Sequence, residues 1–374
     1  MRNYAKGCQP RLQALIKALC KIPAPSHHER QRAEFVRKWF CDQGFFAYID
    51  DALNVICPWG VTDENDVIAV MAHTDTVFPD LNPMPFEETP RYFRCPGVTD
   101  DTAQLSVMMI AARYFMKNYL PPKTGILFVA NSCEEGLGNL KGSRRIVKDY
   151  GSRLQALISL DGGSSFQRVV NEAVGSHRYR VTVKTEGGHS FNAFGNRNAI
   201  QVLASMINEL YTIEVPQKEN TKTTYNVGTI EGGTSVNTIA QEASMLYEYR
   251  SDDRACLTQM KQAFETVIEN FRAQGYDVEA ELIGDRPCTG DIDPQKQKAL
   301  EDLVNASILR VTGQPADFAS GSTDCNAALA EGIPSVCVSA CLGGKCHTRE
   351  EYLDLDSLES GMNLTMDLLS NFIE

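Results

Sequence analysis

Acidic or histidine side chains follow each of three apolar runs in the first half of the chain. VIAVMAHTD ends in His73 and Asp75, GILFVANSCEEG ends in Glu134 and Glu135, and QALISLD ends in Asp161. Short runs rich in Val, Ile and Leu are typical of buried strands in a largely parallel sheet. Because ligands bind outside the carboxyl ends of such strands, we expect these side chains to meet at one edge of the sheet.

Two further segments supply side chains of the same kinds. GVTDDTAQ places Asp100 and Asp101 at the start of a segment with helical periodicity, and CHTREE places His347 just beyond an apolar run at 334–340. A helix start also favours acidic residues as caps, so one of the two aspartates has a structural interpretation as good as its functional one. The candidate metal ligands are His73, Asp100, Glu135, Asp161 and His347.

Two imidazoles and three carboxylates make a nitrogen and oxygen donor set. That set suits Zn²⁺, Co²⁺ or Mn²⁺ better than a structural zinc held by thiolates. Five ligands exceed the needs of one open tetrahedral ion, and they suit two ions about 4 Å apart that share a carboxylate. We therefore expect two divalent ions, with zinc favoured. Asp75 can orient the imidazole of His73, and Glu134 can act as general base.

The elements that must position these residues alternate between strand and helix. A helical face is predicted between the first two runs by Leu105, Met108, Met109, Ala112 and Met116. Near residue 176 the pattern changes to period-two strands mixed with helices, and the α/β pattern resumes near 287. We predict an α/β catalytic domain, a mostly parallel mixed sheet flanked by helices, from residues 1–175 and 287–374. Residues 176–286 are predicted to form an inserted α+β lid or dimerisation domain.

Composition excludes several classes of partner. The net charge of −12 argues against nucleic acid or an anionic membrane surface. We find no apolar window long enough to span a membrane and no export signal at the N-terminus. The twelve cysteines include no CxxC pair, so we expect reduced thiols in the cytoplasm. The spacing in CVSACLGGKCH does not fit a thiolate zinc site.

As a set and in this order, HTD, GVTDD, CEEG, LDGG and HTREE resemble the motifs of the co-catalytic metallohydrolases of the M20 peptidase family. That family includes peptidase T, glutamate carboxypeptidases and acetylornithine deacylases. The resemblance covers essentially the whole chain. It implies that His73, Glu135, Asp161 and His347 bind metal, that Asp100 bridges the ions, that Asp75 orients His73, and that Glu134 is the general base.

The resemblance also reaches into the inserted block. It implies that His189 in EGGHSFNAFG stabilises an oxyanion, and that Asn237 in TSVNTIA and Arg250 in YEYRSDD contact the substrate. His189 could instead be a turn residue, and Arg250 a surface ion-pair partner. The chain has DDTAQLS where family members often carry lysine and glycines, which bears on the choice between Asp100 and Asp101.

The expected reaction is amide hydrolysis of a small substrate by metal-activated water. We favour an exopeptidase that acts on short peptides. An N-acyl amino acid amidohydrolase would use the same chemistry, and a non-catalytic protein that only binds a ligand is the third alternative. A homodimer formed through the lid is also compatible with this interpretation.

Overall fold

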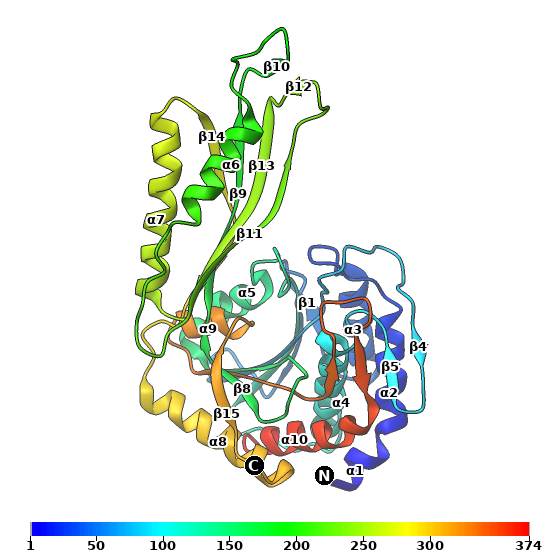
Figure 1. Cartoon of the computed structure of the whole chain (residues 1–374). Helices are drawn as coiled ribbons and strands as arrows, with labels where there is room; N and C mark the ends of the chain where they lie inside the picture. The colour runs from blue at the N-terminus through cyan, green and yellow to red at the C-terminus, as the bar shows by residue number, and fades with distance from the viewer. Residues whose placement is uncertain (1, 374) are drawn as a thin grey trace. The chain divides into compact units, whose positions relative to one another are not determined.

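The chain forms two compact units in a computed structural model that describes residues 2–373 (Figure 1). The first comprises Met1–Ala173 and Gly290–Glu374, and the second comprises Val174–Thr289. The second unit is therefore an insertion within the first. These boundaries lie within three residues of those expected from the change in sequence pattern.

The first unit is built on an eight-stranded mixed sheet. Its four central strands run parallel to one another, and their carboxyl ends therefore lie at one edge. The strands, in spatial order, are β1 (Tyr48–Ile49), β2 (Val55–Trp59), β6 (Gly125–Asn131), β3 (Val67–His73), β7 (Leu154–Leu160), β16 (Ser335–Val338), β8 (Arg168–Ala173) and β15 (Asp317–Gly321).

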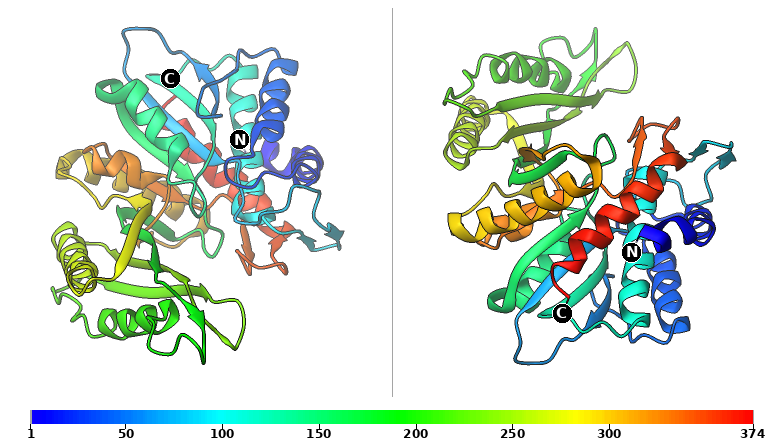
Figure 2. Two further views of the ribbon diagram at one scale, coloured as in Figure 1. Left: turned by 90° about the horizontal axis from the view of Figure 1, so that it is seen from above. Right: turned by 90° about the horizontal axis from the view of Figure 1, so that it is seen from below.

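Helices cover both faces of this sheet. In β3, Ile68, Val70 and Ala72 belong to one core, whereas Val67, Ala69 and Met71 belong to another. Strand β3 is buried along its whole length, which explains its unbroken apolar run. The first core holds α1 (Arg2–Gly7), α2 (Gln9–Cys20), α3 (Arg30–Asp42), α4 (Gln104–Lys117), α8 (Pro294–Thr312) and α10 (Leu358–Ser370). The second holds α5 (Lys141–Tyr150) and α9 (Cys325–Ala330). Figure 2 shows α8 and α10 side by side. Helices on both faces of a mostly parallel sheet confirm the predicted α/β class.

A small four-stranded sheet joins distant parts of the first unit. Its order is β17 (Leu342–Gly344), β18 (Tyr352–Asp354), β5 (Tyr92–Arg94) and β4 (Glu87–Glu88). Strand β5 leads into η1 (Val98–Ala103), and the loop from β17 to β18 carries His347. The pairing of β5 with β18 therefore brings Asp100 and His347 into one neighbourhood. Strands of two or three residues are too short to show a periodicity in the sequence.

The second unit is an α+β layer structure. Its sheet is antiparallel throughout, in the order β11 (Thr223–Gly232), β13 (Glu242–Ser251), β9 (Gly175–Lys184) and β14 (Asp277–Arg286). Helices α6 (Ala199–Leu210) and α7 (Arg254–Ala273) pack against this sheet and share its core (Figure 1). A two-stranded sheet of β10 (Gly188–His189) and β12 (Thr238–Ile239) lies in the same unit.

Two remaining features bear on the expectations from composition. Among residues 2–373, none of the helices is both long enough and apolar enough to cross a membrane. The cysteines are free thiols, and all but Cys41 and Cys346 are buried. Two short 3₁₀ helices, η2 (Gly151–Arg153) and η3 (Leu355–Ser357), complete the elements.

One close helix contact gives a test of the packing. A Cβ atom added at Gly361 of α10 would overlap the backbone carbonyl of Ala340, just beyond β16. We expect Gly361→Ala to lower the free energy of unfolding by about 1–3 kcal/mol, although alanine favours helix. Thermal unfolding measures this change. Ser360→Ala, on the exposed side of the same helix, is the matched control and should be near neutral. Equal stability of the two variants would contradict the packing.

Candidate active site

One carboxylate faces two imidazoles at the sheet edge. Asp100 Oδ1 lies 3.0 Å from His73 Nε2, and Asp100 Oδ2 lies 3.0 Å from His347 Nε2. His347 Nε2 is also 3.2 Å from Glu135 Oε1. Two oxygens of one carboxylate that each face a different imidazole form the arrangement needed to bridge two cations.

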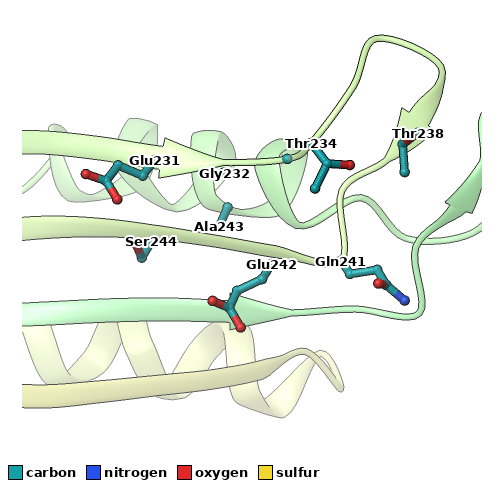
Figure 3. A pocket seen from close by; sticks show the side chains of 9 residues that line it. Glu231, Gly232, Thr234, Thr238, Gln241, Glu242, Ala243 and Ser244 are labelled. Carbon is teal, nitrogen blue, oxygen red and sulfur yellow. The ribbon is translucent and has the colours of Figure 1, made fainter.

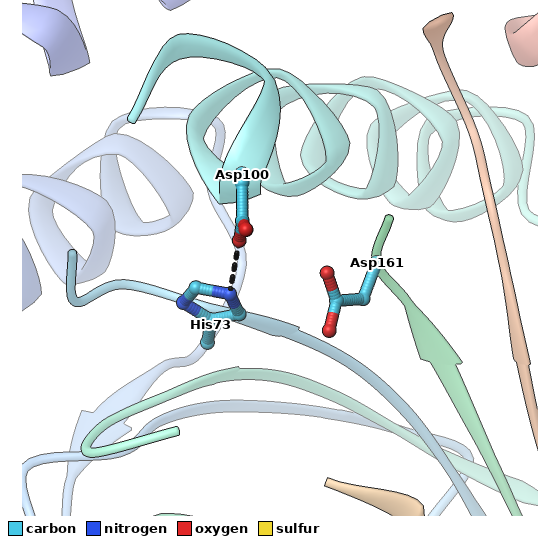
Figure 4. A group of neighbouring side chains, drawn as sticks. All are labelled: His73, Asp100 and Asp161. Atoms are coloured by element: carbon cyan, nitrogen blue, oxygen red, sulfur yellow. Dashed lines mark hydrogen bonds and ion pairs between the residues drawn. The ribbon is translucent and has the colours of Figure 1, made fainter. Parts of the chain in front are cut away.

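The same carboxylate belongs to two groups of potential ligands. His73, Asp100 and Asp161 form one group, in which a ligand atom of each residue lies within 4.8 Å of the others (Figure 4). Asp100, Glu135 and His347 form the second group under the same limit. The structure therefore brings together all five predicted ligands, in two groups of three that share Asp100.

The parallel strands account for this convergence. His73 is the last residue of β3 and pairs in register with Asn131, the last residue of β6. Glu135 lies in the loop after β6, and Asp161 directly follows β7. Because these strands share one direction, their loops leave the sheet on the same side. His347 reaches the group from the loop after β17, with a left-handed backbone at φ 63°.

Burial and mutual repulsion dominate the electrostatics of the carboxylates. Burial raises the pKa of Glu135 to about 8, and the neighbouring charges of Asp100 and Glu134 add to this effect. Burial also raises the pKa of Asp161 to about 6, again helped by Asp100. For Asp100, burial would raise the pKa, but hydrogen bonds with His347 and His73 lower it below its usual range.

The imidazoles respond in the opposite direction. Close contacts with the carboxylates of Asp100 and then Glu135 raise the pKa of His347 to about 11. Burial would lower the pKa of His73, but the charge of Asp101 and the contacts with Asp100 and Asp75 raise it well above its usual value. In these contacts a proton on each imidazole supplies positive charge between the carboxylates, as a bound cation would.

Divalent cations fit this group of residues. Glu135 Oε1 is buried and, within residues 2–373, accepts no hydrogen bond, although His347 lies beside it. Buried carboxylates with raised pKa values are destabilised by one another and are relieved by a positive charge. The donors are two nitrogens and several oxygens, with no thiolate, which suits zinc, cobalt or manganese.

Buried carboxylates behind the ligands accept hydrogen bonds from the backbone of the ligand loops. Asp75, fully buried, accepts from Glu134 N at 3.0 Å and from Glu135 N at 2.9 Å. Its backbone oxygen lies 3.0 Å from His73 Nδ1, closer than its carboxylate at 3.5 Å. His73 is thus contacted more closely by the Asp75 backbone oxygen than by the carboxylate that we expected to orient it, and that carboxylate holds the loop with both glutamates.

The two adjacent aspartates have different surroundings. Asp101 Oδ2 accepts from the backbone N–H of His73 at 2.7 Å, whereas both oxygens of Asp100 face imidazoles. Burial raises the pKa of Asp101 well above its usual value. This geometry favours Asp100 as the bridging residue and gives Asp101 a part in holding His73.

Sequence reasoning missed two buried acids at this site. Glu351 accepts from the backbone N–H groups of Gly97 at 2.8 Å, Thr99 at 2.8 Å and Asp100 at 3.0 Å. Asp324 accepts from Asn131 Nδ2 at 2.6 Å, and burial, together with the charge of Glu134, raises its pKa to about 7. Glu351 closes the HTREE motif, so its closeness to His347 in sequence was an available signal.

The predicted residues of the second unit are not all neighbours. His189 pairs with Thr238 between β10 and β12, and the backbone N–H of Ser190 donates to Asn237 O at 2.9 Å. Arg250 lies at the opposite end of β13 and forms two hydrogen bonds of 3.0 Å with Glu248. The structure therefore joins His189 to Asn237 but separates both from Arg250.

A pocket opens at the end of the second unit's sheet near β12. Glu231, Thr238, Gln241 and Glu242 are among its lining residues, together with the backbone of Gly232 (Figure 3). Thr238 is the partner of His189, but the pocket wall itself carries two carboxylates and no cationic side chain. A substrate carboxylate would be repelled there.

Comparison with known proteins agrees with this geometry. The model of Peptidase family M20/M25/M40 matches residues 69–371. The chain belongs to that family. It is therefore a hydrolase of a metal-dependent peptidase and amidohydrolase family, and the resemblance inferred from the motifs is confirmed.

Individual relatives in this family are distant. The uncharacterized protein YqjE of Bacillus subtilis (strain 168) is 25% identical, over 94% of this chain and 95% of that protein. The aminopeptidase PepT of Bacillus cereus ATCC 10987 has a TM-score of 0.70 at 23% identity, over 97% of this chain and 98% of that one. YxeP of Bacillus subtilis, described as a dinuclear metal binding peptidase of the M20 family, has a TM-score of 0.63 at 17% identity, over 98% of both chains. The structural likenesses show a shared fold.

The two groups that share Asp100 lead to a prediction about metal binding. Metal-free protein should bind two Co²⁺ or Zn²⁺ ions per chain. Asp100→Asn should lower the affinity for both ions by about 100-fold or more. This loss exceeds the one typical of residues that only support ligands. Asp161→Asn should lower the affinity for one ion and leave the affinity for the other unchanged. Calorimetric titration measures both constants.

The same titration should release protons. The pKa of His347 is about 11 in the metal-free protein, so its proton must leave before a cation binds near pH 7. Affinity should therefore fall as the pH is lowered. Two ions that weaken equally in Asp161→Asn, or binding without proton release, would contradict the arrangement.

Proposed function

We propose that the protein is an exopeptidase that hydrolyses short peptides with two divalent ions, zinc being favoured, and Glu134 as general base. The observation that carries the proposal is the Asp100 carboxylate that faces two imidazoles, with a buried glutamate pair beside it. Family membership supports amide hydrolysis as the reaction.

Glu134 is suited to move a proton. Glu134 is 5% exposed, and its backbone N–H donates to Asp75. One ligand atom each of His73, Glu134 and Glu135 lies within 4.8 Å of the others. When bound, the ions would polarise the scissile carbonyl and lower the pKa of water. Glu134 would accept a proton from that water and return it to the leaving amine.

Substrate recognition is proposed for the second unit. His189 is exposed near Asn237, where an imidazole could stabilise an oxyanion. Arg250 could pair with a substrate carboxylate through two of its guanidinium nitrogens. Glu248 already occupies that position, so a substrate carboxylate would have to compete with it. This competition favours a substrate whose carboxylate also binds a second group of the protein.

Assembly and location complete the proposal. Strand β11 is an edge strand of the second unit's sheet and is exposed over most of its length, with Ile230 53% exposed. An unpaired strand edge is suited to pairing with a second copy, which supports a homodimer through this unit. The many buried free thiols support the cytoplasm as its compartment.

The test of this function is a hydrolysis screen with Glu134→Gln as the diagnostic variant. Metal-loaded wild type should cleave di- and tripeptides, and chelation should abolish cleavage. Glu134→Gln should keep both ions and lose kcat by about 10²–10⁴-fold, because it lacks the base. Steady-state kinetics and metal analysis measure the two effects.

Glu64→Gln, in an exposed loop, is the matched control and should behave as wild type. N-acetyl and N-succinyl amino acids belong in the same screen. Cleavage of these compounds alone would replace the peptidase with an amidohydrolase. Full kcat in Glu134→Gln would refute the assigned base, and full activity without metal would refute the mechanism.

Arg250 gives a separate prediction about specificity. Arg250→Ala should raise KM by about 10–100-fold for peptides with a free C-terminal carboxylate, the loss expected for hydrogen bonds to a charged group. Peptides amidated at that end should change little. Arg180→Ala, on the exposed side of β9 in the same sheet, is the control. Equal losses on free and amidated peptides would show that Arg250 is structural.

A further inference from the structure

An N-terminal segment of the first unit contacts the loop that carries the glutamate pair. Ser26 Oγ donates to Asp75 Oδ2 at 2.7 Å and lies 3.3 Å from Glu135 O. His27 Nδ1 lies 3.5 Å from Cys133 Sγ. Strand pairing does not make these contacts, since residues 26–29 lie in the turn between α2 and α3. The segment meets the loop through side chains.

Glu29 makes the central contacts of this segment. Its side chain is 0% exposed, and its Oε1 accepts from Cys133 N at 3.0 Å, Cys133 Sγ at 3.1 Å and His27 N at 2.9 Å. Burying a carboxylate costs free energy unless hydrogen bonds or charges compensate. The three contacts of the Glu29 carboxylate join two segments of the chain. This buried glutamate therefore has a positional role in the fold.

The residue that Glu29 holds is in a strained conformation. Cys133 has φ 57°, in the left-handed region that residues other than glycine rarely adopt. Such a conformation costs about 1–3 kcal/mol and persists only where surrounding contacts impose it. Rotation of Cys133 toward an ordinary conformation would turn the peptide bond that it shares with Glu134.

That peptide bond already has a partner. Its N–H belongs to Glu134 and donates to Asp75 Oδ1, and the next N–H, of Glu135, donates to Asp75 Oδ2. Three successive N–H groups, from Cys133 to Glu135, are thus held by two buried carboxylates. Asp75 holds the second and third, and Glu29 holds the first at the strained residue.

We infer that Glu29 is a positioning residue that sets the direction of Glu134 and Glu135 by holding Cys133 in its left-handed conformation. The inference rests on the proposed function for the part played by Glu134. Loss of Glu29 should disturb the group of Asp100, Glu135 and His347, and it should spare the group of His73, Asp100 and Asp161. A defect confined to one ion distinguishes this role from a general loss of stability.

The experiment compares Glu29→Ala with Glu29→Gln in the full chain. Glu29→Ala should lower kcat by about 10–100-fold and leave KM within about threefold of the wild-type value. It should lower the affinity for one of two Co²⁺ ions by about the same factor as kcat. Glu29→Gln keeps an oxygen acceptor for the Cys133 N–H and should recover most of both losses. Co²⁺ titration of metal-free protein, followed by visible absorption, measures binding without relying on activity.

Glu34→Ala, exposed on α3, removes the same charge from the same part of the chain and should match wild type. Wild-type kcat and Co²⁺ binding in Glu29→Ala would overturn the inference. So would equal weakening of both ions, or Glu29→Gln as impaired as Glu29→Ala. If wild type cleaves no peptide, the proposed function fails, whereas the one-ion defect in the titration still tests Glu29.

Discussion

Hydrogen bonds from backbone N–H groups to buried carboxylates are the interaction on which the site depends. Asp75 receives two from the glutamate loop, Asp101 receives one from His73, and Glu351 receives three around Asp100. The segments that carry Glu135, Asp161 and His347 lie outside the helices and strands. Because the acceptors are buried, these bonds fix the loops more firmly than solvent-exposed contacts would.

This arrangement concentrates negative charge inside the protein, and one buried cation offsets part of it. Arg32 is 2% exposed and donates to the backbone oxygens of Thr74 at 2.8 Å and Ile22 at 2.6 Å. Burial lowers its pKa, and the charges of Asp75 and Asp101 act in the opposite direction. The outer carboxylates thus have an internal counterion, whereas we propose that metal ions offset the charge of the ligands.

The sequence was informative where chemistry coincides with periodicity. Buried parallel strands show as apolar runs, so the ends of β3, β6 and β7, and the acids beyond them, could be located before the structure. The small sheet of β5 and β18 could not, because its strands are too short, and Glu351 was missed with it. Arg250 was grouped with His189 by motif, yet strand direction places it at the other end of β13, a distance that only three-dimensional pairing reveals.

The order of the ligand segments along the chain has a consequence for synthesis at the ribosome. His73, Asp100 and Asp161 all precede the inserted unit, whereas His347 and Glu351 follow it. A nascent chain therefore holds the residues of one cation group long before the other can form. The segment around Asp100 also lacks its Glu351 acceptor until residues beyond the inserted unit emerge. The group of Asp100, Glu135 and His347 can therefore form only after both sequence segments of the first unit have been made.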